Sequence, residues 1–555
     1  MTELRRNFSS FFRLPSVVLV ASVFAVPVSA APTINAIANA ASNITFNAPL
    51  AQGSIFIIKG TGLGPANISI ASTPFQSTTL SGTSVAVTVG NTTVNAPMYY
   101  TSDGQVAALL PSTTPTGTGM FVVTYNGQAS GAVGHGIVAS NVGIFTIDSS
   151  GQGPAIVTYP DYSLVSSGKA ANCGGPNTAC GAANPGDTLI IWATGMGPVS
   201  GNELTGSGLG TNMPNVPLTL WLGGVQVAAS YQGRSGCCVG EDEIVFKVPN
   251  NTPIGCAVPL AIQVGSGANT ISNTTALPVA NGSRTCPITN TALASVNVED
   301  AVLNSTVTFG SVRLNHFTNP GSPPTFEDDG NFQFFRITSY APGSQPFFTS
   351  FLDSIPPGTC AAYANLNPGQ NTPITGVTPL DAGSSFTVKG PNGSVTVAGT
   401  PGQFKPQLNA TGTFLVPGAY TVTGGGGADV GPFNGAITFP AVPTLTSPVN
   451  PAAAVRANGL QVSWSGGDPN GNVEIDVFGA TDNTFTLGDT AICIAPAKPG
   501  TFTIPPYVLL SIVPTNFGGL VLSPADVTAP FTASGLSLGV LTMHNDGNSV
   551  ALVVK

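Results

Sequence analysis

A block of about 100 residues occurs twice in this chain of 555 residues. Each copy has a Gly-x-Gly-Pro motif after an apolar segment, at Gly62–Pro65 and, 133 positions later, at Gly195–Pro198. Further on, Leu110–Pro111 recurs as Val248–Pro249 at an offset of 138, so the second copy holds five extra residues, which fall near Gly233–Cys238. A repeat of this length indicates one folding unit that is used twice.

The segments inside each copy are short, alternate apolar with polar residues, and end at Gly, Asn or Pro, which is typical of β-sandwiches. Only 7% of residues are charged, too few for the solvated faces of helical bundles or coiled coils. Charge-driven disorder is excluded because 42% of residues are hydrophobic. The sequence therefore predicts an all-β, multidomain chain of tandem immunoglobulin-like β-sandwiches.

We expect six segments, with a Pro-, Thr- and Ser-rich boundary before the last one. They are a signal peptide at 1–30, a first sandwich at 31–145, a linker with strand segments and a Cys173/Cys180 loop at 146–183, a second sandwich at 184–286, a third β-rich domain at 287–445 and a C-terminal sandwich-like domain at 446–555.

The first 30 residues have the three parts of a signal peptide. Arg5, Arg6 and Arg13 give a positive region, Leu14–Val26 is mostly apolar, and Val28–Ala30 supplies small residues before a cleavage site. A membrane anchor is the alternative, but the apolar run is short for a bilayer span, and no later run is long enough. We expect an exported protein that is secreted, periplasmic or on the cell surface, without a transmembrane segment after the signal is removed.

All eight cysteines follow the signal peptide: Cys173, Cys180, Cys237, Cys238, Cys256, Cys286, Cys360 and Cys493. An even number in an exported chain favours disulfides, whereas the absence of C-x-x-C spacing and of nearby His argues against zinc. Cys173 and Cys180 flank one short loop and are expected to pair. Adjacent cysteines seldom bond to each other, so we expect Cys237 and Cys238 to reach Cys256 and Cys286. Elimination leaves Cys360 with Cys493.

Several motifs resemble those of a family of uncharacterised secreted proteins that are abundant in acidobacteria. They are Asn39–Ser42, Gly60–Pro65, Val142–Asp148, Asn184–Asp187 and, most specifically, Gly236–Gly240 followed by Phe246–Pro249. The resemblance covers about residues 36–286 and implies paired immunoglobulin-like units of the type called IPT or TIG. It carries over no catalytic residues.

Motifs that would support catalysis or cofactor binding are incomplete. Gly535–Gly539 has the G-x-S-x-G pattern, but too few residues follow it to supply a helix, an acid and a histidine. Gly60–Gly64 lacks the Lys and the helix of a nucleotide loop. The acidic stretches Glu327–Asn331 and Asp468–Glu474 do not complete a calcium loop. We expect a protein that is not an enzyme, with no catalytic residue, cofactor or metal.

A possible binding surface comprises Tyr99, Tyr100, Glu241, Asp242 and Glu243. Adjacent residues of a strand point to opposite sides, so one tyrosine is expected in the core and the other at the surface. The three acidic residues are expected in a solvated loop beside the cysteines. The tryptophans, by contrast, lie in apolar alternation typical of core positions: Trp192, Trp221 and Trp464.

Charge narrows the class of partner. The chain has 15 Lys and Arg against 24 Asp and Glu, with no cationic cluster for a phosphate backbone, so we expect no nucleic acid. The leading hypothesis is a non-enzymatic protein that acts in extracellular binding or adhesion through its immunoglobulin-like domains, with an extracellular protein or glycan as partner. One alternative is a carbohydrate-binding or polysaccharide-active accessory protein. Another is a structural component of an envelope or matrix.

Overall fold

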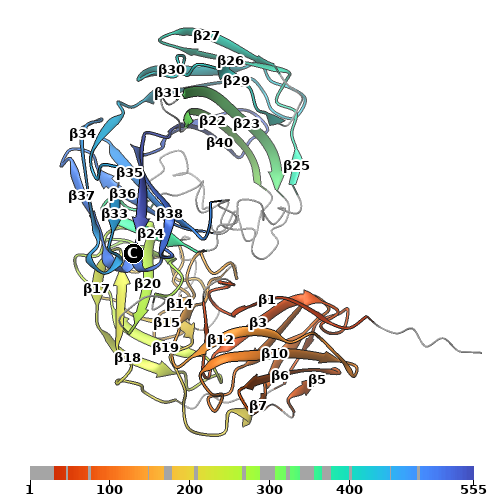
Figure 1. The fold of residues 1–555 in the computed structure, drawn as a ribbon. Coiled ribbons are helices and arrows are strands. Elements are labelled where there is room, and N and C mark those ends of the chain that lie inside the picture. Colours follow the sequence, from red (N-terminus) through yellow and green to blue (C-terminus); the bar gives the residue numbers. More distant parts are fainter. Residues whose placement is uncertain are drawn as a thin grey trace, which may run out of the picture.

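The regular secondary structure of the computed structural model is almost entirely β-strand, and the strands are arranged as four β-sandwiches (Figure 1). It describes residues 30–45, 48–72, 75, 77–147, 149–167, 175, 178–205, 210–265, 271–287, 307–319, 325–337, 355–364, 377–398, 403–450, 452–483 and 488–555. The expected signal peptide, apart from Ala30, lies outside these residues. Within the described part of the chain, no helix is long and apolar enough to cross a membrane.

The first sandwich contains β1 (Thr33–Asn39), β2 (Leu50–Ala51), β3 (Ile55–Thr61), β4 (Ser69–Ile70), β5 (Thr79–Leu80), β6 (Thr83–Val89), β7 (Thr92–Asn95), β8 (Met98–Thr101), β9 (Gln105–Leu109), β10 (Gly117–Tyr125), β11 (Gln128–Ala129) and β12 (Val133–Val138). Its sheets have the orders β1-β3-β9-β8-β4 and β2-β12-β10-β6-β5. Alternation sends Phe56 and Ile58 of one sheet and Val85 and Phe121 of the other into a shared core.

The second sandwich contains β13 (Gly143–Ile144), β14 (Val157–Thr158), β15 (Thr188–Thr194), a 3-10 turn (Glu203–Thr205), β16 (Leu218–Leu222), β17 (Val225–Val227), β18 (Ala229–Arg234), β19 (Asp242–Lys247), β20 (Gly255–Val264) and β21 (Thr275–Val279). Its sheets are β13-β15-β19-β18, with β14 on β15, and β17-β16-β20-β21. Strands β3 and β15 begin and end 133 positions apart, which confirms the repeat, and the extra residues lie between β18 and β19.

The third sandwich contains β22 (Val307–Asn319), β23 (Thr325–Ile337), β25 (Val377–Pro379), β26 (Ser385–Gly390), β27 (Gly393–Ala398), β28 (Gln403–Phe404), β29 (Gln407–Asn409), β30 (Gly418–Gly424), β31 (Phe433–Phe439), β39 (Val527–Phe531) and β40 (Leu538–Asn545). Its sheets are β25-β23-β22-β40-β39 and β27-β26-β30-β31. Aromatic rings fill the space between them, with Phe334 stacked on Phe386 and Phe433 on Phe531.

The fourth sandwich contains β24 (Thr359–Tyr363), β32 (Pro443–Ser447), β33 (Ala452–Ala454), a 3-10 turn (Arg456–Asn458), β34 (Leu460–Gly466), β35 (Asn472–Ala480), β36 (Gly488–Pro496), β37 (Thr501–Ile504), α3 (Pro506–Leu510), β38 (Thr515–Pro524) and β41 (Asn548–Val554). Its sheets are β24-β36-β35-β38-β41-β33 and β32-β34-β37. Trp464 is 5% exposed within this core, as expected.

Strand pairing crosses the boundary expected after residue 445 in both directions. From the C-terminal side, β40 pairs in parallel with β22, from Phe309↔Leu538 to His316↔Asn545. From the other side, β24 pairs with β36. Parallel neighbours need a long crossover connection, and the fourth sandwich supplies it. The C-terminal half therefore consists of two sandwiches that exchange strands.

The disulfides differ from expectation at the adjacent cysteines. Cys237 and Cys238 are bonded to each other, and Cys256 is bonded to Cys286. The expected exchange between the two groups is wrong because they lie on different sheets: Cys237 and Cys238 are in the loop that leads into β19, whereas Cys256 is on β20 in the other sheet of the sandwich. Cys360 is bonded to Cys493, the pair that elimination predicts. Cys180 is disulfide-bonded, and Cys173 lies outside the described residues.

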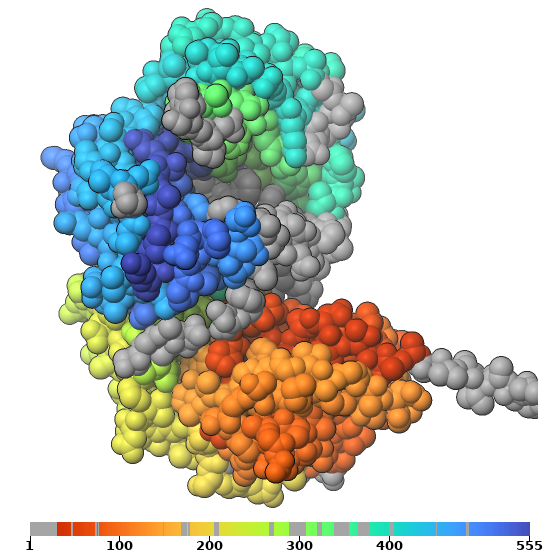
Figure 2. Space-filling model, in the orientation of Figure 1, coloured from red at the N-terminus to blue at the C-terminus, as the bar shows by residue number. Residues whose placement is uncertain are grey.

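The two halves of the chain meet between the second and fourth sandwiches, which lie against each other in Figure 2. Trp221 of β16 stacks on Tyr507 of α3 with 4.5 Å between ring centroids. Nearby, the backbone N–H of Ala362 donates to Thr274 Oγ1 at 3.4 Å. Trp221, expected in a core, is therefore an interface residue. A stacked pair of aromatic rings stabilises an interface by more than the burial of its apolar surface alone.

A substitution at Leu541 tests the exchange of strands between the third and fourth sandwiches. Leu541 lies on β40, is 1% exposed and belongs to the core of the third sandwich. We expect Leu541→Ala to destabilise that sandwich by about 2–5 kcal/mol, because truncation leaves a cavity. Peptide-level hydrogen exchange should then increase in β22 and β26, more than 140 positions away in sequence.

Leu552→Ala is the matched control, because Leu552 is also 1% exposed but lies in the core of the fourth sandwich. It should increase exchange in β35 and β38 instead. If Leu541→Ala affected only residues 446–555, the pairing of β40 with β22 would be contradicted.

Candidate functional site

An open hollow of about 660 Å³ lies on the outer face of the sheet that contains β15 in the second sandwich. The residues that line it are Phe145, Ile156, Thr158, Tyr162, Trp192, Cys237 and Glu241. Most are apolar or aromatic, and Glu241 brings a carboxylate. Wide, largely apolar concavities with a few polar groups are typical of small-molecule and saccharide sites.

Trp192 forms one wall of the hollow because of the alternation of β15. Leu189, Ile191 and Ala193 point into the core, so Trp192 points outward. Its indole Nε1–H donates to Thr158 Oγ1 at 3.1 Å, which fixes the orientation of the ring. The expectation that Trp192 is a core residue is therefore wrong. Apolar alternation alone does not tell which face of a sheet a large ring occupies.

Tyr162 stands beside Trp192, with 6.2 Å between ring centroids. Its side chain is 48% exposed although its φ is +65°, a conformation that bulky residues rarely adopt. The turn that imposes it is closed by a hydrogen bond from Tyr162 N–H to Tyr159 O, 2.9 Å, and by Asp161, which accepts bonds from Ser163. Backbone strain that presents an exposed ring is more typical of a binding position than of a structural one.

The loop between β18 and β19 contributes Cys237 and Glu241 to the lining, and it carries the Cys237–Cys238 disulfide. Tyr99 of the first sandwich donates its hydroxyl proton to Val239 O, and Thr194 Oγ1 donates to Gly240 O at 2.6 Å. The loop is thus held from two sandwiches at consecutive residues.

A buried ion pair lies directly behind this loop. Arg234 at its start and Asp242 at its end form a salt bridge and are 1% and 0% exposed. Arg234 Nη2 also donates to Gly53 O of the first sandwich at 2.6 Å and to Gly197 O at 2.7 Å. Burial raises the pKa of Asp242, and Arg234 acts in the opposite direction. The expectation of a solvated loop is wrong for Asp242, because this carboxylate is the partner of a buried cation.

Among the described residues that line the hollow, Glu241 carries the carboxylate. Within the described part of the chain, its carboxylate has no hydrogen-bond partner. Burial, together with the nearby Asp242 and Glu243, raises the pKa of Glu241 to about 7. A half-buried carboxyl group without a partner can accept hydrogen bonds from a ligand when it is ionised, and it can donate one to a ligand when it is protonated.

The remaining predicted residues do not line the hollow. Glu243 accepts a hydrogen bond from Ser235 Oγ at 3.0 Å and is the ladder neighbour of Trp192. Tyr99 and Tyr100 are both half-buried, so the expected division into one core and one surface tyrosine is wrong. A register shift between Met98 and Tyr100 breaks the alternation there.

Sequence reasoning missed Tyr162, Phe145, Ile156 and Thr158. The motif Pro160–Ser163 was a usable signal, because Pro and Asp before an aromatic residue favour a tight turn. The other three could not be identified, since Ile156 and Thr158 reach the hollow through the pairing of β14 with β15 and Phe145 through the pairing of β13 with β15.

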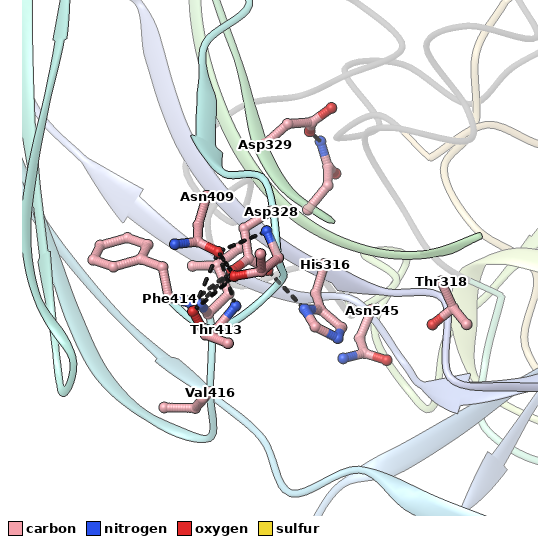
Figure 3. A network of polar contacts seen from close by, with 12 residues as sticks. His316, Thr318, Asp328, Asp329, Asn409, Thr413, Phe414, Val416 and Asn545 are labelled. Atoms are coloured by element: carbon pink, nitrogen blue, oxygen red, sulfur yellow. Dashed lines mark hydrogen bonds and ion pairs between the residues drawn. The ribbon is translucent and has the colours of Figure 1, made fainter. Parts of the chain in front are cut away.

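A polar network in the third sandwich centres on Asp328, which is 0% exposed (Figure 3). Its carboxylate accepts hydrogen bonds from Phe414 N–H at 2.7 Å and Leu415 N–H at 3.0 Å, and it lies 2.7 Å from His316 Nδ1. Glu327–Asn331 thus lies inside strand β23 rather than in a loop. These bonds satisfy Asp328 and fix the turn before β30, so we assign the network a structural role.

A second charged group joins the third and fourth sandwiches. His544 lies between Asp526 (2.7 Å) and Asp546 (3.1 Å), and Arg313 lies 3.3 Å from Asp526. Burial alone would lower the pKa of His544, but hydrogen bonds with the two carboxylates outweigh burial and raise it to about 9.

The G-x-S-x-G serine does not lie in a catalytic arrangement. Ser537 Oγ lies 2.9 Å from Thr308 Oγ1, and its backbone N–H donates to Thr308 O. These contacts join the start of β40 to β22, so the motif serves strand pairing.

Comparisons with known proteins give structural neighbours only. No family model matches the chain, and no curated protein matches its sequence. Solved structures include the SGBP-B protein of a xyloglucan utilization locus in Bacteroides uniformis, with 10% identity over 86% of this chain and 97% of that one and a TM-score of 0.15.

Two further neighbours are multidomain fragments. Sidekick-1 immunoglobulin domains 1–5 align with 10% identity over 92% of this chain and 100% of that one, with a TM-score of 0.11. Domains 5–6 of the S-layer protein SbsC align with 14% identity over 45% and 100%, with a TM-score of 0.16. The all-β, tandem immunoglobulin-like architecture of this chain rests on its own sheets, and the resemblance to IPT or TIG units stays a prediction.

The buried pair makes a stability prediction. Asp242→Asn should destabilise the protein by about 3–5 kcal/mol, because it leaves the Arg234 cation buried without its counter-charge. Asp187→Asn is the control: it breaks the half-exposed pair with Arg284 and should cost at most about 1 kcal/mol. Urea unfolding monitored by Trp fluorescence measures both, and equal losses would contradict the special role of the buried pair.

The His544 group predicts a pH dependence. The pKa of His544 in the folded protein is about 9, above the unfolded value of 6.5, so its stabilisation is complete below pH 6.5 and is lost as pH rises through 9. The effect is at most about 3 kcal/mol. Burial also raises the pKa of Asp476 from 3.8 to about 7, so the ionisation of Asp476 lowers stability as pH rises through that range, which lies below the range of His544.

Unfolding free energy should therefore fall between pH 7 and 9.5 in the wild type and much less in His544→Gln. Parallel pH profiles of the two proteins would rule this out.

Proposed function

We propose that the protein is an exported, non-enzymatic glycan-binding protein that holds its ligand in the hollow of the second sandwich. The observation that carries this proposal is the pair of surface rings, Trp192 and Tyr162, fixed next to each other on the wall of an open concavity. Flat aromatic faces pack against the apolar C–H faces of sugar rings, and adjacent polar groups bind the hydroxyls.

The geometry favours a preformed site. Trp192 is oriented by its bond to Thr158, so its ring loses little freedom when a ligand binds, and the turn fixes the backbone of Tyr162 beside it. Glu241 offers hydrogen bonds within the same hollow. An open shape suits an internal stretch of a polysaccharide, which must enter and leave at both ends.

The proposed compartment follows from two observations. The first 30 residues have the pattern of a signal peptide, and three disulfides join described cysteines, which is typical of oxidising compartments. We therefore place the protein outside the cytoplasm, as a secreted, periplasmic or cell-surface binding protein. Polysaccharides are abundant ligands in all three places.

Trp192→Ala tests the site. On an array of neutral and acidic oligosaccharides that includes cellohexaose and mannohexaose, we expect the wild-type chain to bind and Trp192→Ala to lose at least about tenfold in affinity, because a stacked ring contributes about 1–1.5 kcal/mol beyond the area it buries. Trp192→Phe should be intermediate.

Tyr100→Ala is the matched control, since it removes an aromatic ring from the first sandwich. It should bind as the wild type does. Absence of binding to every glycan, or equal binding by Trp192→Ala with its disulfides and circular dichroism unchanged, would refute the proposed function.

A further inference from the structure

The backbone that carries Glu241 is fixed at the edge of the hollow. The backbone carbonyl of Glu241 accepts a hydrogen bond from Ser235 N–H at 2.9 Å, and the next residue, Asp242, is held by the buried Arg234. The preceding residue is Gly240, where a Cβ atom would lie 2.6 Å from Leu109 and 2.9 Å from Ile55. Close packing on one side and an ion pair on the other therefore fix the position of Glu241.

Within the described part of the chain, the charged side chain that lines the hollow is that of Glu241, and two more acidic residues lie next to residues of the lining. Asp161 precedes Tyr162, and Glu243 is the ladder neighbour of Trp192. Among the described residues that line the hollow, none is Lys or Arg. Arg234 is near in sequence, but it is 1% exposed and bonded to Asp242, Gly53 and Gly197. An anionic ligand would thus meet carboxylates without a compensating cation.

We propose that Glu241 makes the hollow selective for uncharged polysaccharides over polysaccharides that carry carboxylates. The inference rests on the proposed function, of which it names the ligand class. A neutral sugar can donate its hydroxyl protons to the Glu241 carboxylate, whereas a uronate places a like charge beside it in a half-buried site. A like charge placed directly beside the Glu241 carboxylate weakens binding by about tenfold.

The protonation of Glu241 sets the conditions of the test. Burial and the neighbouring Asp242 and Glu243 raise the pKa of Glu241 to about 7, so the group is ionised at pH 8.5. At that pH the repulsion of a uronate is fully present. It should weaken when salt is raised, because the hollow is open to solvent.

The experiment compares one polysaccharide in two forms at pH 8.5. The neutral glycan that binds most strongly on the array is oxidised at its C6 hydroxyls to carboxylates, and both forms are titrated calorimetrically into the full mature chain. We expect the wild type to bind the oxidised form at least about tenfold more weakly. Glu241→Gln should reduce this ratio to less than about threefold, and because the two forms are compared within the same variant, any loss of affinity common to both forms leaves the ratio unaffected.

Glu327→Gln is the matched control, because it removes the same charge from the third sandwich, where Glu327 accepts a bond from Gln407. It should leave the ratio unchanged. The inference is overturned if the strongest array ligand is itself acidic, if the oxidised form binds equally well, or if Glu241→Gln keeps the wild-type ratio. In each of these cases Trp192→Ala still weakens binding, so glycan binding itself stands. If no glycan binds, the proposed function fails, and this inference fails with it.

Discussion

The ion pair between Arg234 and Asp242 is the contact on which the N-terminal half depends. Each of its members would be costly to bury alone, and each is held by further hydrogen bonds that cross element boundaries. Arg234 reaches Gly53 of the first sandwich and Gly197 of the second, while Asp242 accepts the N–H of Met196 at 2.7 Å. One buried pair therefore fixes the two sandwiches to each other and also closes the base of the loop that walls the hollow.

Much of the fold could be predicted from the sequence, because local physics dictates it. Alternation and turn residues indicate strands, and the repeat shows that β3 and β15 occupy equivalent places. The pairing of β22 with β40 could not be predicted. These strands are separated by more than 200 residues, and nothing local in either strand specifies a parallel partner so far along the chain. The boundary expected after residue 445 rests on a change in composition, but the strand pairing extends across that position.

The candidate site was predicted only in part for a related reason. Glu241 stood out because acidic residues are rare in this chain, and it does line the hollow. Its neighbour Asp242 has the same chemistry and the opposite role, since its partner Arg234 is visible only once β18 pairs with β19. Trp192 was assigned to a core because alternation defines two faces of a strand without saying which face is covered. Which face of a strand is covered depends on how the sheets pack together in the folded protein.

The two copies of the repeat differ at the residues that form the hollow of the second sandwich. At the position of Trp192 the first copy has Lys59, and where the second copy has the loop Ser235–Glu241 the first has a short turn between β8 and β9. The outer face of that first sheet is occupied by Ile57, Ala107 and the half-buried Tyr99 and Tyr100. Both copies keep the same core alternation, so the scaffold tolerates these differences. The site thus arises from changes on the outer face and in one inserted loop, and the Arg234–Asp242 pair holds that loop in a fixed position. Loops on a rigid scaffold are where such changes least affect stability.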